Sequence, residues 1–83
     1  MTRDELTALR ANLMAELEVD INEFGDREYR AVWRTVRGKL IIVDYFALDD
    51  LEAVERLYPD DCLQVLKASE IFKQLKIQRG QQA

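Results

Sequence analysis

Residues 29–46, YRAVWRTVRGKLIIVDYF, restrict the fold of this chain more than any other segment. Two runs rich in β-branched and aromatic residues flank Arg37-Gly38, which predicts two antiparallel strands joined by a two-residue turn. In that register Trp33 lies opposite Ile42. A longer loop with a shifted register is the alternative, because Arg-Gly is not among the strongest turn dipeptides.

One face of this predicted hairpin is apolar enough to form a core. Side chains alternate across a strand, so the register groups on this first face Tyr29, Ala31, Trp33, Leu40, Ile42 and Phe46. Asp44 falls on the same face and does not fit there, unless a polar group pairs with it or the strand ends before it. We expect a helix to pack on this face.

The second face of the hairpin is also too apolar for a surface that contacts only water. It carries Arg30, Val32, Arg34, Val36, Ile41, Val43 and Tyr45. An isolated hairpin is marginally stable, and both of its edges offer unpaired backbone groups. Two explanations stay open: helices of the same chain cover both faces, or a second copy adds its own hairpin.

A long helix is expected before the hairpin. Thr2 and Glu5 fit a capping box, and apolar residues then recur at steps of three and four until Gly25, which suits a helix end. Arg10 is expected on the wetter side of this helix. Residues 17–24 also fit a period of two, but no turn precedes them, so we expect helix there as well.

Two further helices are expected after the hairpin. The first begins at Asp49 or Asp50, runs for about two turns and stops near Pro59. The second begins at Asp60 or Asp61, and its apolar face consists of Cys62, Val65, Leu66, Phe72 and Leu75. The sequence therefore predicts one α+β domain over residues 1–83: an N-terminal helix, a two-stranded antiparallel hairpin, a short helix and a C-terminal helix, with residues 80–83 frayed.

The composition offers little to catalysis. The chain has no His and one Cys, so it lacks the commonest general base and the commonest ligand of transition metals. Ser69 is the only serine, and no histidine is present to activate it. The paired aspartates at 49–50 and 60–61 are better explained as helix caps than as metal ligands or catalytic acids. We expect no enzymatic activity, no metal and no cofactor.

Charge is distributed in blocks, and the blocks indicate two classes of partner. Residues 26–39 carry five basic and two acidic side chains, whereas residues 40–61 carry one basic and seven acidic. The basic block suggests a nucleic-acid contact through Arg30, Arg34, Arg37 and Lys39, although a net charge of −4 weighs against it. The acidic block fits a small acidic inhibitor of a nucleic-acid enzyme, of the kind that phages and mobile elements carry.

The hypothesis that the sequence favours is a small protein-interaction module that forms a homodimer through its hairpin. The hairpins meet edge to edge, or through a face formed by Val32, Arg34, Ile41, Val43 and Tyr45. No apolar run is long enough to span a membrane, no leader is recognisable and the cysteine is single, so we expect a cytoplasmic protein. The sequence identifies neither the partner protein nor the pathway.

Overall fold

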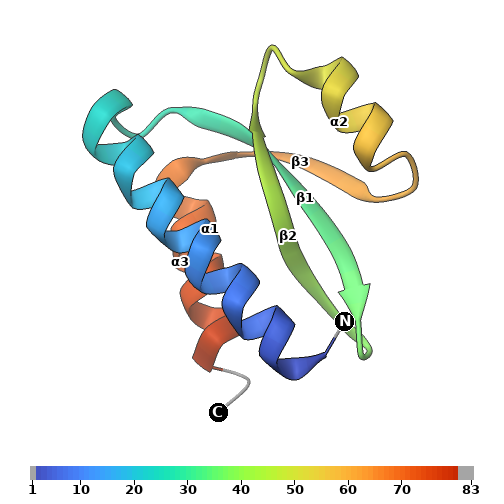
Figure 1. Cartoon of the computed structure of the whole chain (residues 1–83). Helices are drawn as coiled ribbons and strands as arrows, with labels where there is room; N and C mark the ends of the chain where they lie inside the picture. The colour runs from blue at the N-terminus through green and yellow to red at the C-terminus, as the bar shows by residue number, and fades with distance from the viewer. Residues whose placement is uncertain (1, 81–83) are drawn as a thin grey trace.

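Three strands form the sheet in the computed structural model, which describes residues 2–80 (Figure 1). The elements follow in the order α1 (Arg3–Phe24), β1 (Glu28–Val36), β2 (Lys39–Ala47), α2 (Leu51–Leu57), β3 (Cys62–Lys67) and α3 (Ala68–Gly80). The sheet is antiparallel with the strand order β2-β1-β3. The predicted α+β class is confirmed, and the expected hairpin gains a third strand on its β1 side.

Local signals in the sequence account for both ends of α1. The Glu5 N–H donates to Thr2 Oγ1 at 3.1 Å, which confirms the predicted cap. At the other end Gly25 adopts a φ of 79°, and its N–H donates to the Ile21 carbonyl at 2.8 Å. Residues 17–24 are helical, so the absence of a turn before them outweighed their period of two.

The hairpin turn also follows the sequence. Arg37 and Gly38 have φ values of 53° and 77°, the paired left-handed conformation of a two-residue turn whose twist matches that of the strands. Trp33 lies opposite Ile42 as predicted. The register shifts by one residue beyond this pair, because Val43 is an extra residue that forms a bulge in β2.

The bulge exchanges the faces of the β2 residues that follow it. Tyr45 pairs with Ala31 on the first face, and its ring lies edge-on to Tyr29 at a centroid distance of 5.1 Å. Phe46, predicted on the first face, instead lies on the second. Asp44 also moves to the second face, which removes the misfit that the regular register produced.

Strand β3 replaces the first part of the helix predicted from Asp60 or Asp61. The helix α3 begins only at Ala68, where the Asp26 carboxylate accepts hydrogen bonds from the Ser69 N–H and hydroxyl, both at 2.7 Å. Cys62, expected in the core, is therefore an exposed residue of β3. Gly80 belongs to α3, and the rest of the predicted frayed end, residues 81–83, lies outside the described residues.

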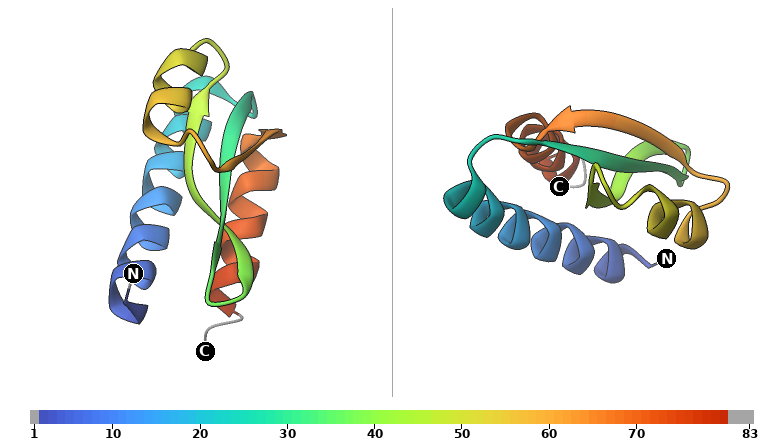
Figure 2. Two further views of the ribbon diagram at one scale, coloured as in Figure 1. Left: turned by 90° about the vertical axis from the view of Figure 1, so that its right-hand side faces the viewer. Right: turned by 90° about the horizontal axis from the view of Figure 1, so that it is seen from above.

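Two apolar clusters hold the elements together. The helices α1 and α3 contact each other beside the β1–β2 hairpin (Figure 2), and the cluster where the three meet contains Leu13, Leu17, Tyr29, Ala31, Ile42, Ala68, Ile71 and Leu75. The other cluster, on the second face of the hairpin, contains Leu6, Val32, Ile41, Val43 and Val54. Because α1 contributes to both clusters, it passes along the β2 side of the sheet and closes that side.

Candidate functional site

The protein's own chain covers the second face of the hairpin. Val54 of α2 and Leu6 of α1 pack with Val32, Ile41 and Val43, and all five side chains are buried. Of the two explanations that the sequence left open, the structure shows the first. The predicted partner face of Val32, Arg34, Ile41, Val43 and Tyr45 is corrected accordingly: three members are core residues, Tyr45 lies on the other face, and Arg34 has an internal partner.

Polar contacts connect the segment between α2 and β3 to the hairpin. Arg34 donates two hydrogen bonds to the Asp61 carboxylate, Nη2 at 2.7 Å and Nε at 3.2 Å, and its guanidinium lies 5.6 Å from the centre of the Tyr58 ring. The Tyr58 hydroxyl donates to Asp44 Oδ2 at 2.9 Å. Partial burial and this contact with Asp44 raise the pKa of Tyr58 to about 12. The segment between α2 and β3 is thereby fixed against the second face.

The four basic residues proposed for nucleic-acid contact do not act as one surface. Arg30 donates two hydrogen bonds to the Leu48 carbonyl, at 3.1 and 3.0 Å, and Arg34 is paired with Asp61. Arg37 and Lys39 lie at the hairpin turn, where their side chains are exposed and make no hydrogen bond or ion pair with another described residue. The structure thus separates two arginines with internal contacts from two cations that are accessible to a ligand.

The outer edge of β3 is the first candidate site. β3 is the last strand of the sheet, and only its inner edge pairs with β1. Its side chains Leu63 and Val65 are 37% and 45% exposed and share the second face with Val32. Sequence reasoning missed this strand because the alternation Leu63-Gln64-Val65 is short, whereas a helical stripe continues through Leu75.

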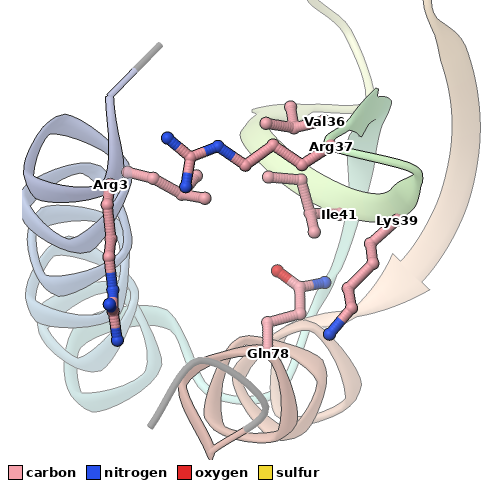
Figure 3. Close-up of a pocket in the computed structure, with 7 residues that line it drawn as sticks. Arg3, Val36, Arg37, Lys39, Ile41 and Gln78 are labelled. Carbon is pink, nitrogen blue, oxygen red and sulfur yellow. The ribbon is translucent and has the colours of Figure 1, made fainter.

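A pocket between α1, α3 and the hairpin turn is the second candidate site (Figure 3). Its volume is about 220 Å³, and it lies on the side of the sheet opposite to β3. Three cations, three aliphatic side chains and one amide line it: Arg3, Arg37, Lys39, Leu6, Val36, Ile41 and Gln78. None of these lining residues is acidic.

Gln78 is the buried polar group of this pocket. Its side chain is 5% exposed, and its Oε1 accepts a hydrogen bond from the Ile42 N–H at 3.3 Å. Because the backbone N–H must be the donor, the other amide atom is the nitrogen Nε2. That nitrogen is buried and has no hydrogen-bond partner in the structure. Figure 3 shows the side chain reaching from α3 into the hollow beneath the turn.

Arg10 holds the two helices that border this pocket. Its Nη1 donates to the Gln78 carbonyl at 2.8 Å, and its Nε donates to the Leu6 carbonyl at 3.3 Å. The prediction that Arg10 lies on the wetter side of α1 is wrong, because this side chain is buried between α1 and the end of α3. No signal near Arg10 in the sequence could have indicated this, since Gln78 lies 68 residues further along the chain.

Comparison with protein-family models, with curated proteins and with solved structures gave no match. Within residues 2–80 no group of three or more His, Cys, Asp or Glu side chains is placed to hold a metal ion. In the same part of the chain, no helix combines the length and the apolar character needed to cross a membrane.

Proposed function

We propose that the protein is a small interaction module that forms a homodimer by pairing β3 with β3 of a second copy. The observation that carries the proposal is the open outer edge of β3 with Leu63 and Val65 exposed beside it. Soluble proteins usually protect such an edge with charges, a proline or a covering element, because unpaired backbone groups there recruit another strand. Cys62–Leu66 contain neither a charge nor a proline.

The sequence of β3 is complementary to itself. In an antiparallel pair centred on Gln64, Leu63 of each copy lies opposite Val65 of the other, and Cys62 lies opposite Leu66. The same register brings Lys67 only to Asp61, whose carboxylate is already paired with Arg34, so the complementarity rests on the apolar positions of Cys62–Leu66. Such a two-fold interface uses one patch twice, and two three-stranded sheets then join into one of six strands.

The oligomeric state tests the proposal directly. Analytical ultracentrifugation over a dilution series from about 1 mM to about 1 µM is expected to show a dimer that dissociates on dilution. Val65→Lys places a charge at the interface and is expected to shift the midpoint at least tenfold towards higher concentration. Val19→Lys, which changes a side chain 60% exposed on α1, is the matched control and should leave the midpoint unchanged. A monomer throughout the series contradicts the proposal.

Crosslinking tests the register. In a Cys62→Ser background, Gln64→Cys places one thiol on each side of the two-fold axis, so oxidation or a short thiol crosslinker is expected to give a covalent dimer. Val19→Cys in the same background should not crosslink under these conditions. Equal crosslinking of both variants would show that any association does not use this register of β3.

The other two hypotheses have less support. Two of the four basic residues suggested for nucleic-acid contact make internal hydrogen bonds, which leaves Arg37 and Lys39 at the turn. For the acidic inhibitor, Asp44 and Asp61 accept hydrogen bonds from Tyr58 and Arg34 within the protein. These contacts reduce the number of charges that either partner could use.

A further inference from the structure

We propose that the pocket between α1, α3 and the hairpin turn binds a small organic anion, namely a carboxylate or phosphate group attached to a short apolar group. The site lies on the β2 side of the sheet, so it is separate from the β3 edge and does not depend on dimer formation.

The first support is the unsatisfied donor. A buried N–H without a hydrogen-bond partner is rare in folded proteins and is normally matched by an oxygen of water or ligand. Gln78 Nε2 is such a donor, and its orientation is set because Oε1 is occupied by the Ile42 N–H. Because this nitrogen has almost no accessible surface, the oxygen that satisfies it has to bind at the bottom of the pocket, against the Gln78 amide. An anionic oxygen would form the stronger bond, since hydrogen bonds to charged groups exceed those between neutral groups.

The second support is the charge of the lining. Arg37 and Lys39 extend from the turn, and the side chain of neither makes a hydrogen bond or ion pair with another described residue, while Arg3 lines the pocket along α1 (Figure 3). Figure 3 shows the Arg37 guanidinium towards α1 and the Lys39 ammonium towards Gln78, so a cation lies on each side of the hollow. Both groups attract an anion, and the guanidinium can hold two of its oxygens at once. The pocket is therefore cationic although the whole chain carries a net charge of −4.

The third support is the apolar part of the lining, which restricts the ligand further. Leu6, Val36 and Ile41 form this part, so a bare inorganic anion would leave their surface without a partner. The volume of about 220 Å³ falls below the range of about 300–1,000 Å³ typical of sites for drug-sized ligands. A headgroup with one ring or a short alkyl chain matches both the size and the lining.

Nuclear magnetic resonance on ¹⁵N-labelled protein tests the proposal with three probes: phenyl phosphate, octanoate and inorganic phosphate. One of the two organic anions is expected to shift the Gln78 side-chain amide and the Ile42 N–H saturably, and the tighter one identifies the headgroup. Inorganic phosphate should bind at least tenfold more weakly because it lacks the apolar group. Equal affinity for inorganic phosphate, or no saturable shift with either organic anion at about 10 mM, overturns the proposal.

Two tests, one of the cations and one of the Gln78 donor, separate an effect on binding from an effect on folding. The double variant Arg37→Ala, Lys39→Ala is expected to weaken binding at least tenfold. The control Arg56→Ala, Lys73→Ala removes the same charges away from the pocket and should change affinity less than twofold. Gln78→Glu keeps an acceptor for the Ile42 N–H but replaces the donor with a negative charge, so it should abolish binding. A folded Gln78→Glu protein that binds the anion as well as the wild type would refute the site.

Discussion

The two edges of the sheet differ in how they are protected. At the β2 edge α1 passes alongside, and Gln78 of α3 accepts a hydrogen bond from the Ile42 N–H with its side chain. Among residues 2–80 no strand pairs with the outer side of β3, and Leu63 and Val65 remain exposed. The fold thus covers one edge, where the Ile42 N–H is already hydrogen-bonded, whereas the other edge is open to a further strand.

The two edges also differ in burial. Ile41, Ile42 and Val43 of β2 are all buried, because one apolar cluster lies on each face of this strand. No residue of β3 is fully buried. Local opening is easier where few apolar contacts hold a segment, so we expect the β3 amides to exchange faster than those of β2 in the monomer. If the protection of the β3 amides against hydrogen exchange increases with protein concentration, this edge is the one that takes part in self-association.

Removing the arginine that holds the closed edge together should have the largest effect. Arg10→Ala eliminates hydrogen bonds to the Leu6 and Gln78 carbonyls and a buried side chain, so we expect the free energy of unfolding to fall by about 3 kcal/mol. Urea denaturation measures this change. The exposed Arg56→Ala is the control and should stay within about 0.5 kcal/mol of the wild type. If Arg10→Ala also changes the free energy of unfolding by no more than about 0.5 kcal/mol, the hydrogen bonds of Arg10 to the Leu6 and Gln78 carbonyls do not stabilise the fold.

Opening the β2 edge without disturbing the helices should have a smaller effect. Gln78→Met keeps most of the side-chain volume and leaves the Ile42 N–H without its acceptor, at a cost of about 1.5 kcal/mol in the free energy of unfolding. Hydrogen exchange at Ile42 should accelerate, because its amide would no longer be hydrogen-bonded. Unchanged exchange at Ile42 would show that the closed edge does not depend on this contact.

The segment that leads into the open strand supplies a pH-dependent test. The pKa of Tyr58 is raised from 10.0 to about 12, so its neutral form stabilises the fold below pH 10 and that contribution is lost as the pH rises towards 12. Tyr58→Phe removes the hydrogen bond to Asp44 and should cost about 1 kcal/mol at neutral pH. Its stability should also fall less steeply in alkali, although Tyr45, whose pKa is raised too, still contributes. An alkaline profile identical to that of the wild type would contradict the assignment to Tyr58.

Features set by neighbouring residues could be predicted from the sequence, and features set by distant residues could not. The Thr2 cap and the Arg37-Gly38 turn depend on residues within a few positions of each other. The bulge at Val43 was not predicted. The sequence did contain one sign of it, because a regular register placed the charged Asp44 on the apolar first face.

The candidate sites follow the same rule. β3 forms because β1 offers an edge, which overrides the helical stripe that continues through Leu75. Arg37 and Lys39 were predicted, with Arg30 and Arg34, as candidate nucleic-acid contacts. The pocket that Arg37 and Lys39 line also needs Gln78, a residue that only the tertiary structure brings beside the turn. Of the four polar residues that line the pocket, Arg37 and Lys39 were singled out from the sequence, but Arg3 and Gln78 were not.

Asp26 lies where the open strand meets the helix that closes the other edge, and its substitution should have the smallest effect. Its pKa is lowered, first by the hydrogen bond from the Ser69 N–H and then by that from the Ser69 hydroxyl. The charged form therefore stabilises the fold above pH 3.8, and this contribution is lost as the pH falls below that value. Asp26→Asn should lower the Tm by about 3 °C at neutral pH and by less in acid.

The matched control for this prediction is Asp60→Asn, an exposed carboxylate before β3 that accepts no hydrogen bond from the described residues. Thermal melts of both variants at neutral and acidic pH separate the cap from a general loss of negative charge. If both variants shift the Tm equally at every pH, the cap on α3 contributes nothing, and the junction between the open and the closed edge is held by the Ala68 N–H, which donates to the Arg27 carbonyl at 2.9 Å. If only Asp26→Asn lowers the Tm, and lowers it less in acid, the Asp26 carboxylate stabilises this junction by capping α3 through Ser69, which lies 43 residues further along the chain.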